Sequence, residues 1–402
     1  MSNNNGYLAG KKVLLGVTGS VAAYKAAMLA RSLITGGADV TAVLSKAATR
    51  FITPLTFEAL TGNKAYTDTD LWNGPEVLHI ELAREMDMML VAPATQDVLA
   101  RIAAGRANDL LSLVISAFDG PVGFCPAMHT AMWQSKATQK AVATIKEFGY
   151  AILNPDSGSL ASGDIGAGRL PQEDALFDFA EGLAAPDDLS GLRVLVTTGP
   201  TREPMDPVRM LTNPSSGMMG FALAREAKMR GADVMVIAGP VQISPPPFVN
   251  VQKVETAMEM ADAVDREINN TDVLLMCAAV VDFAPQTIAK NKIEKGDFEG
   301  IIHLKRNPDI LSGVTARENR PFVVGFAAQT DNLLENARKK MKRKHPDLLF
   351  ANLVGKDKIF GSETGAGVLL WPDGRYVDVP ARTKREVARL ILDEAQKGMK
   401  DR

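Results

Sequence analysis

The sequence contains little cysteine, little net charge and no long apolar run. Cys125 and Cys277 are its only cysteines, which excludes a disulfide framework and agrees with a reducing compartment. A net charge of −2 over 402 residues argues against a general binder of nucleic acid or of membrane surfaces. The N-terminus lacks an apolar signal core, and no run has the length of a membrane-spanning helix. We therefore expect a cytoplasmic protein whose positively charged sites are local.

The fingerprint of a dinucleotide-binding domain is also missing. The first strand-to-helix turn, Gly19-Ser20, lacks the Gly-x-Gly-x-x-Gly spacing, and no acidic residue ends the strand expected at 40–44. A mononucleotide such as FMN therefore fits this turn better than NAD. Ser20 is a candidate helix N-cap or phosphate ligand. The spacing alone favours neither interpretation, because any tight strand-to-helix turn uses glycine and serine.

What the sequence does contain is one pattern that occurs twice. An apolar run at 13–17 leads through a small-residue turn into a helical pattern at 22–34 and a second apolar run, and residues 194–238 repeat this order. Both copies carry Gly-Ala-Asp-Val after the helix. Strand, turn, helix and strand form the βαβ unit of a parallel sheet, whose first turn can bind phosphate at a helix N-terminus.

Two such units in one chain of 402 residues predict an α/β protein with two Rossmann-like domains and mainly parallel sheets. The short segment 184–191 contains alanine, proline and aspartate and has the composition of a linker. We expect the first domain over 1–183 and the second over 192–402.

Small and polar residues follow the expected strands of the first domain. Ser45 comes directly after the second strand, Ala94 and Thr95 follow the apolar run at 88–92, and Asn108 follows the next helical segment. Ligands bind at the carboxyl ends of parallel strands, where hydroxyl and amide groups can fix a flat heterocycle. Residues of these types are equally common at helix caps and in turns that bind no ligand.

Three further features of this half stand out. His79 lies on a short expected helix, where a lone histidine is more often structural than catalytic. The segment 126–133, PAMHTAMW, follows a strand and is crowded with Met, His and Trp. Residues 153–169 are rich in glycine and end in Arg169. They predict a mobile loop that docks over a substrate, and the alternative is a disordered connection.

Taken together, these motifs resemble the flavin-dependent cysteine decarboxylases, in particular the phosphopantothenoylcysteine decarboxylases of coenzyme A biosynthesis. The resemblance rests on GSVAAYK at 19–25, His79, the Pro-x-Met-x-x-x-Met-Trp pattern at 126–133 and Gly-x-Gly-Arg at 166–169. It implies a flavodoxin-like domain in which FMN oxidises the cysteinyl carbon, carbon dioxide is lost, and reduction yields 4′-phosphopantetheine. The implied cofactor contacts are Gly19, Ser20, Ser45, Ala94, Thr95 and Asn108.

The same resemblance assigns a catalytic role to His79 and substrate contacts to His129, Met132 and Arg169. Two positions depart from the family pattern. His129 replaces an asparagine whose amide binds the substrate carboxylate, and an imidazole can also donate a hydrogen bond there. Ser162 replaces the cysteine that protonates the enethiolate. Because a hydroxyl is far less acidic than a thiol, either Ser162 relays a proton from water, or His129 or Cys125 is the donor.

Basic side chains of the second half allow two interpretations. Lys340 and Lys344 are four residues apart on one expected helix face. With Lys292 they can neutralise a triphosphate, or they form a solvated basic face. Asp282 follows the strand expected at 273–277 and supplies a carboxylate for a ribose or a metal ion. Arg209 faces a phosphate or pairs with a neighbouring carboxylate such as Asp206.

The second half is similar to the phosphopantothenate–cysteine ligases, which in bacteria are typically fused behind the decarboxylase. The motifs are TREP at 201–204, NPSSG at 213–217, AAVVD at 278–282, NPDI at 307–310 and GFAA at 325–328. The resemblance implies that 4′-phosphopantothenate attacks the α-phosphate of CTP, giving an acyl-cytidylate that L-cysteine converts to an amide. Charge accumulates on that phosphate during attack, so Lys292 and Mg²⁺ are expected to stabilise it.

By this resemblance Lys292 is essential and Asn213 handles the acyl intermediate, while the ligands of Mg²⁺ stay unknown. The implied CTP contacts are Met276, Cys277, Ala278, Asp282, Pro308, Asp309, Ile310, Leu311, Phe326, Lys340 and Lys344. Such ligase domains form dimers and the decarboxylase domains form trimers, so a homo-oligomer is expected.

The sequence therefore predicts a bifunctional enzyme that makes 4′-phosphopantetheine from 4′-phosphopantothenate, L-cysteine and CTP, with no nucleic-acid or membrane partner. A second interpretation is a ligase with a degenerate, regulatory flavoprotein domain, since Ser162 and His129 replace family residues. An unrelated NAD(P) oxidoreductase is disfavoured because neither turn has dinucleotide spacing.

Overall fold

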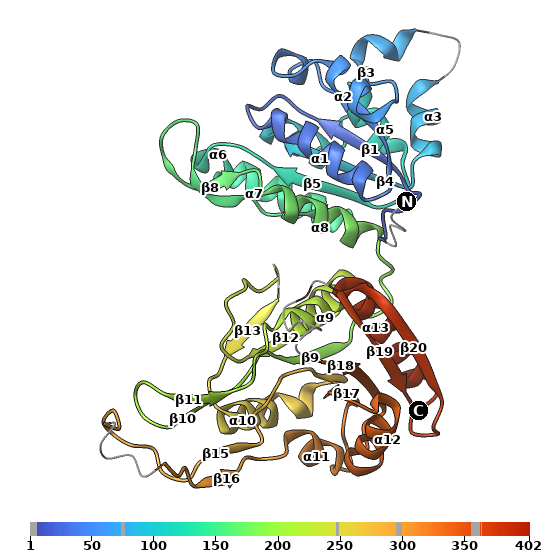
Figure 1. Cartoon of the computed structure of the whole chain (residues 1–402). Helices are drawn as coiled ribbons and strands as arrows, with labels where there is room; N and C mark the ends of the chain where they lie inside the picture. The colour runs from blue at the N-terminus through green and yellow to red at the C-terminus, as the bar shows by residue number, and fades with distance from the viewer. Residues whose placement is uncertain (1–5, 74–76, 247–248, 295–299, 355–361, 363) are drawn as a thin grey trace. The chain divides into compact units, whose positions relative to one another are not determined.

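The computed structural model describes residues 6–73, 77–246, 249–294, 300–354, 362 and 364–402. The chain divides into two compact units, Met1–Ala185 and Pro186–Arg402 (Figure 1). Each unit is an α/β domain built on a mainly parallel sheet, which confirms the predicted fold class. The predicted limits, with a linker at 184–191, stay a prediction. No helix in the described ranges is long and apolar enough to cross a membrane.

The first unit contains a six-stranded sheet in the order β3-β2-β1-β4-β5-β6, and all of its paired strands are parallel. The order reverses between β1 and β4, which creates a crevice at the carboxyl ends of these two strands. Every residue of β4 is buried, as a central parallel strand requires. The strands are β1 Lys12–Val17, β2 Asp39–Leu44, β3 Tyr66–Thr67, β4 Met88–Ala94, β5 Val122–Pro126 and β6 Ala151–Ile152.

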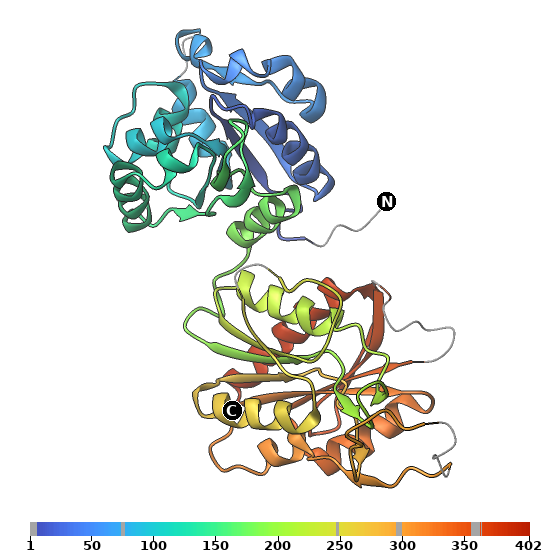
Figure 2. The same cartoon turned by 90° about the vertical axis from the view of Figure 1, so that its left-hand side faces the viewer.

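Helices cover both faces of this sheet (Figure 2). One face packs against α1 and α8 through residues such as Leu29 and Leu176, and the other packs against α4, α5 and α7 through Leu99, Leu111 and Ile145. In α1 the buried residues recur every three or four positions, which is the apolar stripe of an amphipathic helix. The helices are α1 Ala23–Thr35, α2 Pro54–Thr61, α3 Leu78–Glu85, α4 Gln96–Ala103, α5 Leu110–Ala117, α6 Thr130–Trp133, α7 Lys136–Glu147 and α8 Glu173–Ala184, with short 3-10 turns η1 Ala48–Arg50 and η2 Asp68–Trp72.

The glycine-rich segment expected to be a loop is an antiparallel hairpin, β7 Asp156–Ser159 with β8 Ile165–Arg169. Two glycines explain why it lies close to the segment before α6. A Cβ atom on Gly168 would be 2.1 Å from the carbonyl oxygen of Met128, and one on Gly166 would be 2.4 Å from Thr130 Oγ1. Docking of this segment onto the PAMHTAMW segment therefore requires glycine at both positions.

The second unit contains an eight-stranded sheet in the order β13-β12-β9-β14-β17-β18-β19-β20. The pairs from β13 to β18 are parallel, and β19 and β20 are added antiparallel at one edge. The order reverses between β9 and β14, which is the position at which open α/β sheets commonly bind ligands. The strands are β9 Arg193–Thr198, β12 Asp233–Ala238, β13 Asn250–Lys253, β14 Val273–Met276, β17 Phe322–Gln329, β18 Leu348–Leu353, β19 Thr364–Leu370 and β20 Tyr376–Thr383.

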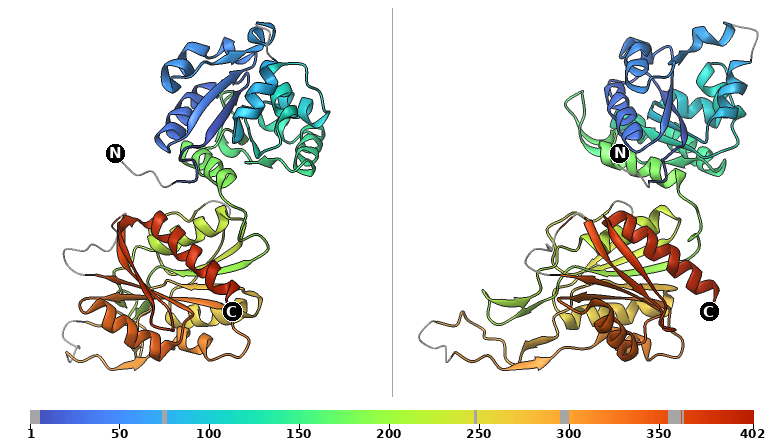
Figure 3. Two further views of the ribbon diagram at one scale, coloured as in Figure 1. Left: turned by 90° about the vertical axis from the view of Figure 1, so that its right-hand side faces the viewer. Right: turned by 45° about the vertical axis from the view of Figure 1, so that its right-hand side comes forward.

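Two small strand pairs project from the same side of the second unit (Figures 1 and 3). They are β10 Arg202–Pro204 with β11 Met210–Thr212, and β15 Phe283–Pro285 with β16 Leu304–Arg306. The helices are α9 Met218–Met229, α10 Ala257–Glu267, η3 Ile268–Asn270, α11 Ile310–Thr315, α12 Leu333–Lys344 and α13 Lys384–Lys400.

Candidate active sites

A cavity of about 920 Å³ lies at the reversal point of the first sheet. Five residues proposed from the sequence line it, namely Gly19, Ser45, Thr95, Asn108 and Met132. They come from the ends of β1, β2 and β4, the turn before α5, and α6. The volume falls in the usual range for a site that binds a cofactor. The cavity therefore lies at the strand ends where the sequence predicts a ligand edge, and the roles of these residues stay predictions.

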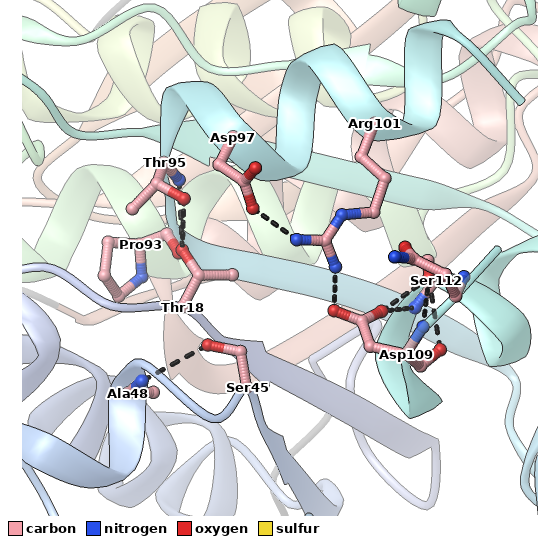
Figure 4. A network of polar contacts seen from close by, with 10 residues as sticks. Thr18, Ser45, Ala48, Pro93, Thr95, Asp97, Arg101, Asp109 and Ser112 are labelled. Carbon is pink, nitrogen blue, oxygen red and sulfur yellow. Dashed lines mark hydrogen bonds and ion pairs between the residues drawn. The ribbon is translucent and has the colours of Figure 1, made fainter. Parts of the chain in front are cut away.

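Thr18 ties the two strands at the reversal point together. Its hydroxyl donates to the carbonyl of Pro93 at 2.7 Å and accepts from the backbone N–H of Thr95 at 3.0 Å (Figure 4). Ser45 Oγ accepts from the N–H of Ala48 at 3.2 Å and so holds the start of η1. A Cβ on Gly19 would lie 2.4 Å from the Cβ of Ala47. Only glycine therefore lets the turn after β1 lie this close to the turn after β2.

Two predicted cofactor contacts are placed differently. Ser20 is not the N-cap of α1, because that helix begins at Ala23 and its N-cap is Ala22. The Ser20 hydroxyl instead accepts from the N–H of Ala22 at 3.2 Å, which closes a local turn. Ala94 is fully buried in the sheet. Neither residue is among those that line the cavity, and their roles stay predictions.

A charged network that the sequence did not point out forms another part of the wall. The guanidinium of Arg101 contacts the carboxylates of both Asp97 and Asp109 (Figure 4). Asp109 also caps α5 by accepting from the N–H of Ser112 at 2.9 Å. Burial lowers the pKa of Arg101, but the two carboxylates outweigh it and raise the pKa. The network therefore holds the guanidinium of Arg101 between two carboxylates that line the same cavity.

Lys46 and Arg50 are two further cations that line the cavity. They follow Ser45 by one and five residues. Two basic residues shortly after a parallel strand are a sequence pattern from which both could have been proposed. Basic groups with hydroxyls at this crevice fit a phosphorylated aromatic cofactor, because its phosphate needs cations and its ring needs hydrogen bonds. The residues present therefore fit a flavin mononucleotide.

The β7–β8 hairpin and the start of α6 bring His129 and Ser162 together, the two residues at which this sequence departs from the pattern of the family it resembles. His129 Nε2 lies 2.8 Å from Asp164 Oδ2, and Ser162 Oγ donates to the same oxygen at 3.0 Å. These hydrogen bonds, that from His129 first, lower the pKa of Asp164. No sequence pattern pointed to Asp164, because its contact with His129 joins the turn of the hairpin to the start of α6, 35 positions away.

The remaining residues proposed for the decarboxylase site do not line the cavity. His79 lies partly buried on α3, and it is not among the residues that line the cavity. Arg169 ends β8, opposite Asp156 of β7. Cys125 is fully buried in β5, and burial raises the pKa of its thiol. A thiol that is both inaccessible and less acidic is a poor proton donor, which argues against Cys125 as the alternative to Ser162.

In the second unit, polar side chains hold the loop that follows β14. Asn213 Nδ2 donates to the carbonyls of Ala279 at 3.1 Å and Val280 at 3.3 Å. Asn307 Nδ2 donates to the carbonyl of Val281 at 2.8 Å. This places Asn213 beside the loop that ends at Asp282, which is exposed. The amide nitrogen of Asn213 is already occupied, so its Oδ1 is the atom left for a ligand.

Predicted nucleotide contacts gather at the carboxyl ends of β14 and β17. Lys340 Nζ donates to the carbonyl of Phe326 at 2.6 Å, and Lys344 contacts Asp309, which caps α11. The side chain of Lys344 is only 14% exposed, which excludes a freely solvated basic face for this residue. Burial first, and then Lys344 and Arg343, lower the pKa of Lys340.

Other predicted contacts adjoin this group. Met276 ends β14 and pairs with Gly325 of the adjacent β17. Cys277 and Ala278 follow Met276 and are half-buried; burial raises the pKa of Cys277 to about 12, while Lys384 opposes the shift. Pro308, Ile310 and Leu311 lie at the start of α11.

Lys292 lies on an exposed segment that a buried carboxylate anchors. Asp206 Oδ2 accepts from the N–H of Ile293 at 3.1 Å and pairs with Arg209 Nη1 at 2.9 Å. Arg209 Nη1 also donates to the carbonyl of Ile293 at 3.0 Å. The ion pair is therefore the observed state of Arg209. In the ranges that the structure describes, three acidic, histidine or cysteine side chains nowhere converge as a metal site would require.

Comparisons with known proteins agree with this arrangement. A family model described as Flavoprotein matches residues 1–185, and one described as DNA/pantothenate metabolism flavoprotein C-terminal domain matches residues 189–399. The chain is 44% identical over 395 residues to the coenzyme A biosynthesis bifunctional protein CoaBC of Escherichia coli strain K12, covering 96% of this chain and 97% of the relative. It is 43% identical over 401 residues to CoaBC of Mycobacterium bovis, covering 95% and 96%.

A solved structure of the C-terminal domain of a CoaBC protein covers 54% of this chain and 100% of its own, with 36% identity and a TM-score of 0.47. The two family models and the near-complete coverage of the relatives confirm the resemblance of both halves, the enzyme class and the flavoprotein nature of the first half. The chain belongs to the family of bifunctional coenzyme A biosynthesis proteins, which join a phosphopantothenoylcysteine decarboxylase to a phosphopantothenate–cysteine ligase.

Proposed function

We propose that the second unit ligates 4′-phosphopantothenate to L-cysteine with CTP, and that the first unit decarboxylates the product to 4′-phosphopantetheine. The observation that carries this proposal is that each unit gathers its own candidate residues beside the strands of its own sheet. The first has a cavity with cations and hydroxyls, and the second has a lysine pair beside the ends of β14 and β17. Separate sites of different chemistry fit two consecutive reactions.

FMN is proposed as the cofactor of the first unit, where Lys46 and Arg50 line the cavity as cations for its phosphate. The hydroxyls of Ser45 and Thr95 are placed to hydrogen-bond to it. When bound, FMN supplies the oxidation and the later reduction of the cysteinyl carbon. Met132 lines this cavity, and His129, the N-cap of the same short helix, lies three residues before it.

In the second unit Lys340 and Lys344 are proposed to bind the CTP phosphates, and Lys292 to stabilise charge on the α-phosphate. Three ammonium groups are suited to a triphosphate, whose charge they offset. Mg²⁺ is proposed to enter with CTP, since this ion is commonly held by substrate phosphates and one or two carboxylates. Asp282 is an exposed candidate for such a carboxylate.

A homo-oligomer is proposed on the basis of an uncovered apolar surface in the first unit. On α1, Tyr24 is 59% and Met28 is 49% exposed, and Val21 in the preceding turn is 61% exposed. Neighbouring apolar side chains of this kind mark association surfaces. Light scattering of the purified protein tests this, with a monomer mass as the contradicting result.

One observation favours the second interpretation, a regulatory flavoprotein half. The hydroxyl of Ser162 already donates to Asp164, and Cys125 is buried, so the acid of the decarboxylase is less evident than the rest of the site. The experiment that separates the interpretations supplies CTP, L-cysteine and 4′-phosphopantothenate and measures pyrophosphate and carbon dioxide separately. We expect both products and a bound flavin. Pyrophosphate without carbon dioxide would leave only the ligase.

A further inference from the structure

Asp164 lies in the turn of the β7–β8 hairpin, where one carboxylate oxygen meets two side chains. Its Oδ2 is 2.8 Å from His129 Nε2 and accepts from Ser162 Oγ at 3.0 Å. The resemblance of the sequence to its family gave roles to His129 and Ser162 and none to Asp164. The carboxylate is thus the point at which two side chains expected near the substrate are joined.

The ring nitrogens of His129 have different partners, and this determines its tautomer. Nδ1 accepts from the backbone N–H of Ala131 at 3.2 Å, at the start of α6. In the neutral ring the proton is therefore on Nε2, which donates to Asp164. Asp164 and the helix start hold the imidazole from opposite sides, so its plane and its proton are both fixed.

The hairpin has two attachments to the α6 segment, and they differ in kind. Near its base the N–H of Met128 donates to the carbonyl of Gly168 at 3.0 Å, which is backbone pairing. At its tip the contact is made through side chains, from Asp164 to His129. The N–H of Leu160 donates to the carbonyl of Asp164 at 2.8 Å, so holding Asp164 also holds the turn that carries Ser162.

We infer that Asp164 is a positioning residue of the decarboxylase site, which sets the tautomer of His129 and the orientation of Ser162 through a single carboxylate. The inference rests on the proposed function of the first unit. The hydrogen bonds from His129 and Ser162 lower the pKa of Asp164, in keeping with an ionised carboxylate that accepts both of them. Asp164 acts through the two other side chains and makes no contact of its own with the substrate.

Asp164→Ala in the full, flavin-loaded chain tests this. The variant removes the acceptor of both hydrogen bonds, and Asp164 is exposed, so folding is expected to survive. We expect kcat/KM for release of carbon dioxide from phosphopantothenoylcysteine to fall about tenfold or more, as for other losses of positioning. Asp164→Asn keeps an acceptor oxygen and should recover part of the loss.

Asp156→Ala is the matched control, since it removes an exposed carboxylate from the same hairpin. We expect its rate to stay within about twofold of the parent, because exposed charges away from the reacting groups have small effects. Flavin absorbance and CTP-dependent pyrophosphate release by the same chain check that both units stay folded. An equal loss in Asp156→Ala would mean that hairpin charge matters and not the contact made by Asp164, which overturns the inference.

A double-mutant cycle with His129→Asn shows whether Asp164 acts through the imidazole. Asparagine is the residue that relatives are expected to carry at this position, so the background should be active. We expect the loss caused by Asp164→Ala to be at least about threefold smaller in it, which is a measurable coupling. The same loss in both backgrounds, or a loss under twofold in the parent, overturns the inference. If the parent itself releases no carbon dioxide, the proposed function of the first unit fails instead.

Discussion

Lys292 is exposed, and amide formation is proposed to depend on its charge. Lys292→Gln should reduce CTP-dependent pyrophosphate release by about 100-fold or more, the size of losing one stabilising group of a charged transition state. Decarboxylation of supplied phosphopantothenoylcysteine should be unchanged. Lys290→Gln, which removes another exposed lysine two residues away, is the control. Loss of both reactions in Lys292→Gln would contradict separate sites.

The ion pair between Asp188 and Arg230 predicts how the free energy of unfolding of the second unit depends on pH. The guanidinium of Arg230, only 1% exposed, donates to Asp188 through Nε and Nη2, both at 2.7 Å. Burial raises the pKa of Asp188, but the hydrogen bonds and charge of Arg230 outweigh it and lower the pKa. A carboxyl whose pKa is lowered by folding stabilises the fold above its unfolded pKa of about 3.9. This stabilisation is lost as the pH falls through the lower, folded value.

Asp188→Asn should therefore lower the free energy of unfolding of the second unit at pH 7 by about 2 kcal/mol, because a buried guanidinium loses one of its charged partners and keeps Asp393. The difference from the parent should shrink at pH values below the folded pKa. Denaturant titrations at both pH values measure it. Asp233→Asn, at an exposed carboxylate of the same unit, should show little effect. A difference that is the same at both pH values would rule out this linkage.

The β7–β8 hairpin depends on close backbone approach. Gly168 has φ 153° and faces the carbonyl of Met128, so Gly168→Ala should displace the hairpin and reduce decarboxylation about tenfold or more. Ligation should be unaffected. Gly149 follows α7, outside the hairpin, with φ 85°, and its Cβ would meet open space. Gly149→Ala should cost only backbone strain on the order of 1 kcal/mol, and equal losses of decarboxylation in the two variants would contradict the docking argument.

The chain carries its two proposed sites in two compact units. Mixing the full chain with Lys292→Gln and the full chain with Gly168→Ala should therefore restore production of 4′-phosphopantetheine from 4′-phosphopantothenate, L-cysteine and CTP. The intermediate made by one chain would be used by another, and mass spectrometry of the product measures this. Activity no greater than that of either variant alone would mean that the intermediate does not pass between chains through solution.

Local sequence was sufficient to predict the fold class and several of the residues at the carboxyl ends of the strands of the first sheet. The apolar runs, the small-residue turns and the repeated Gly-Ala-Asp-Val specify βαβ units, because strand and helix periodicity depend on near neighbours. Since parallel strands end at one edge, Ser45 and Thr95 could be predicted to lie at that edge, where they line the cavity, without knowing any long-range contact.

Tertiary contacts decided the rest. Ser20 closes its own turn because α1 begins three residues later at Ala23, and Arg101 becomes a wall of the cavity because two carboxylates hold it there. Asp164 and His129 are 35 positions apart and meet only because two glycines let a hairpin dock on α6. Hydrogen bonds between distant segments have no local period, so strand and helix patterns cannot reveal them, whereas the packed fold brings their donors and acceptors within reach.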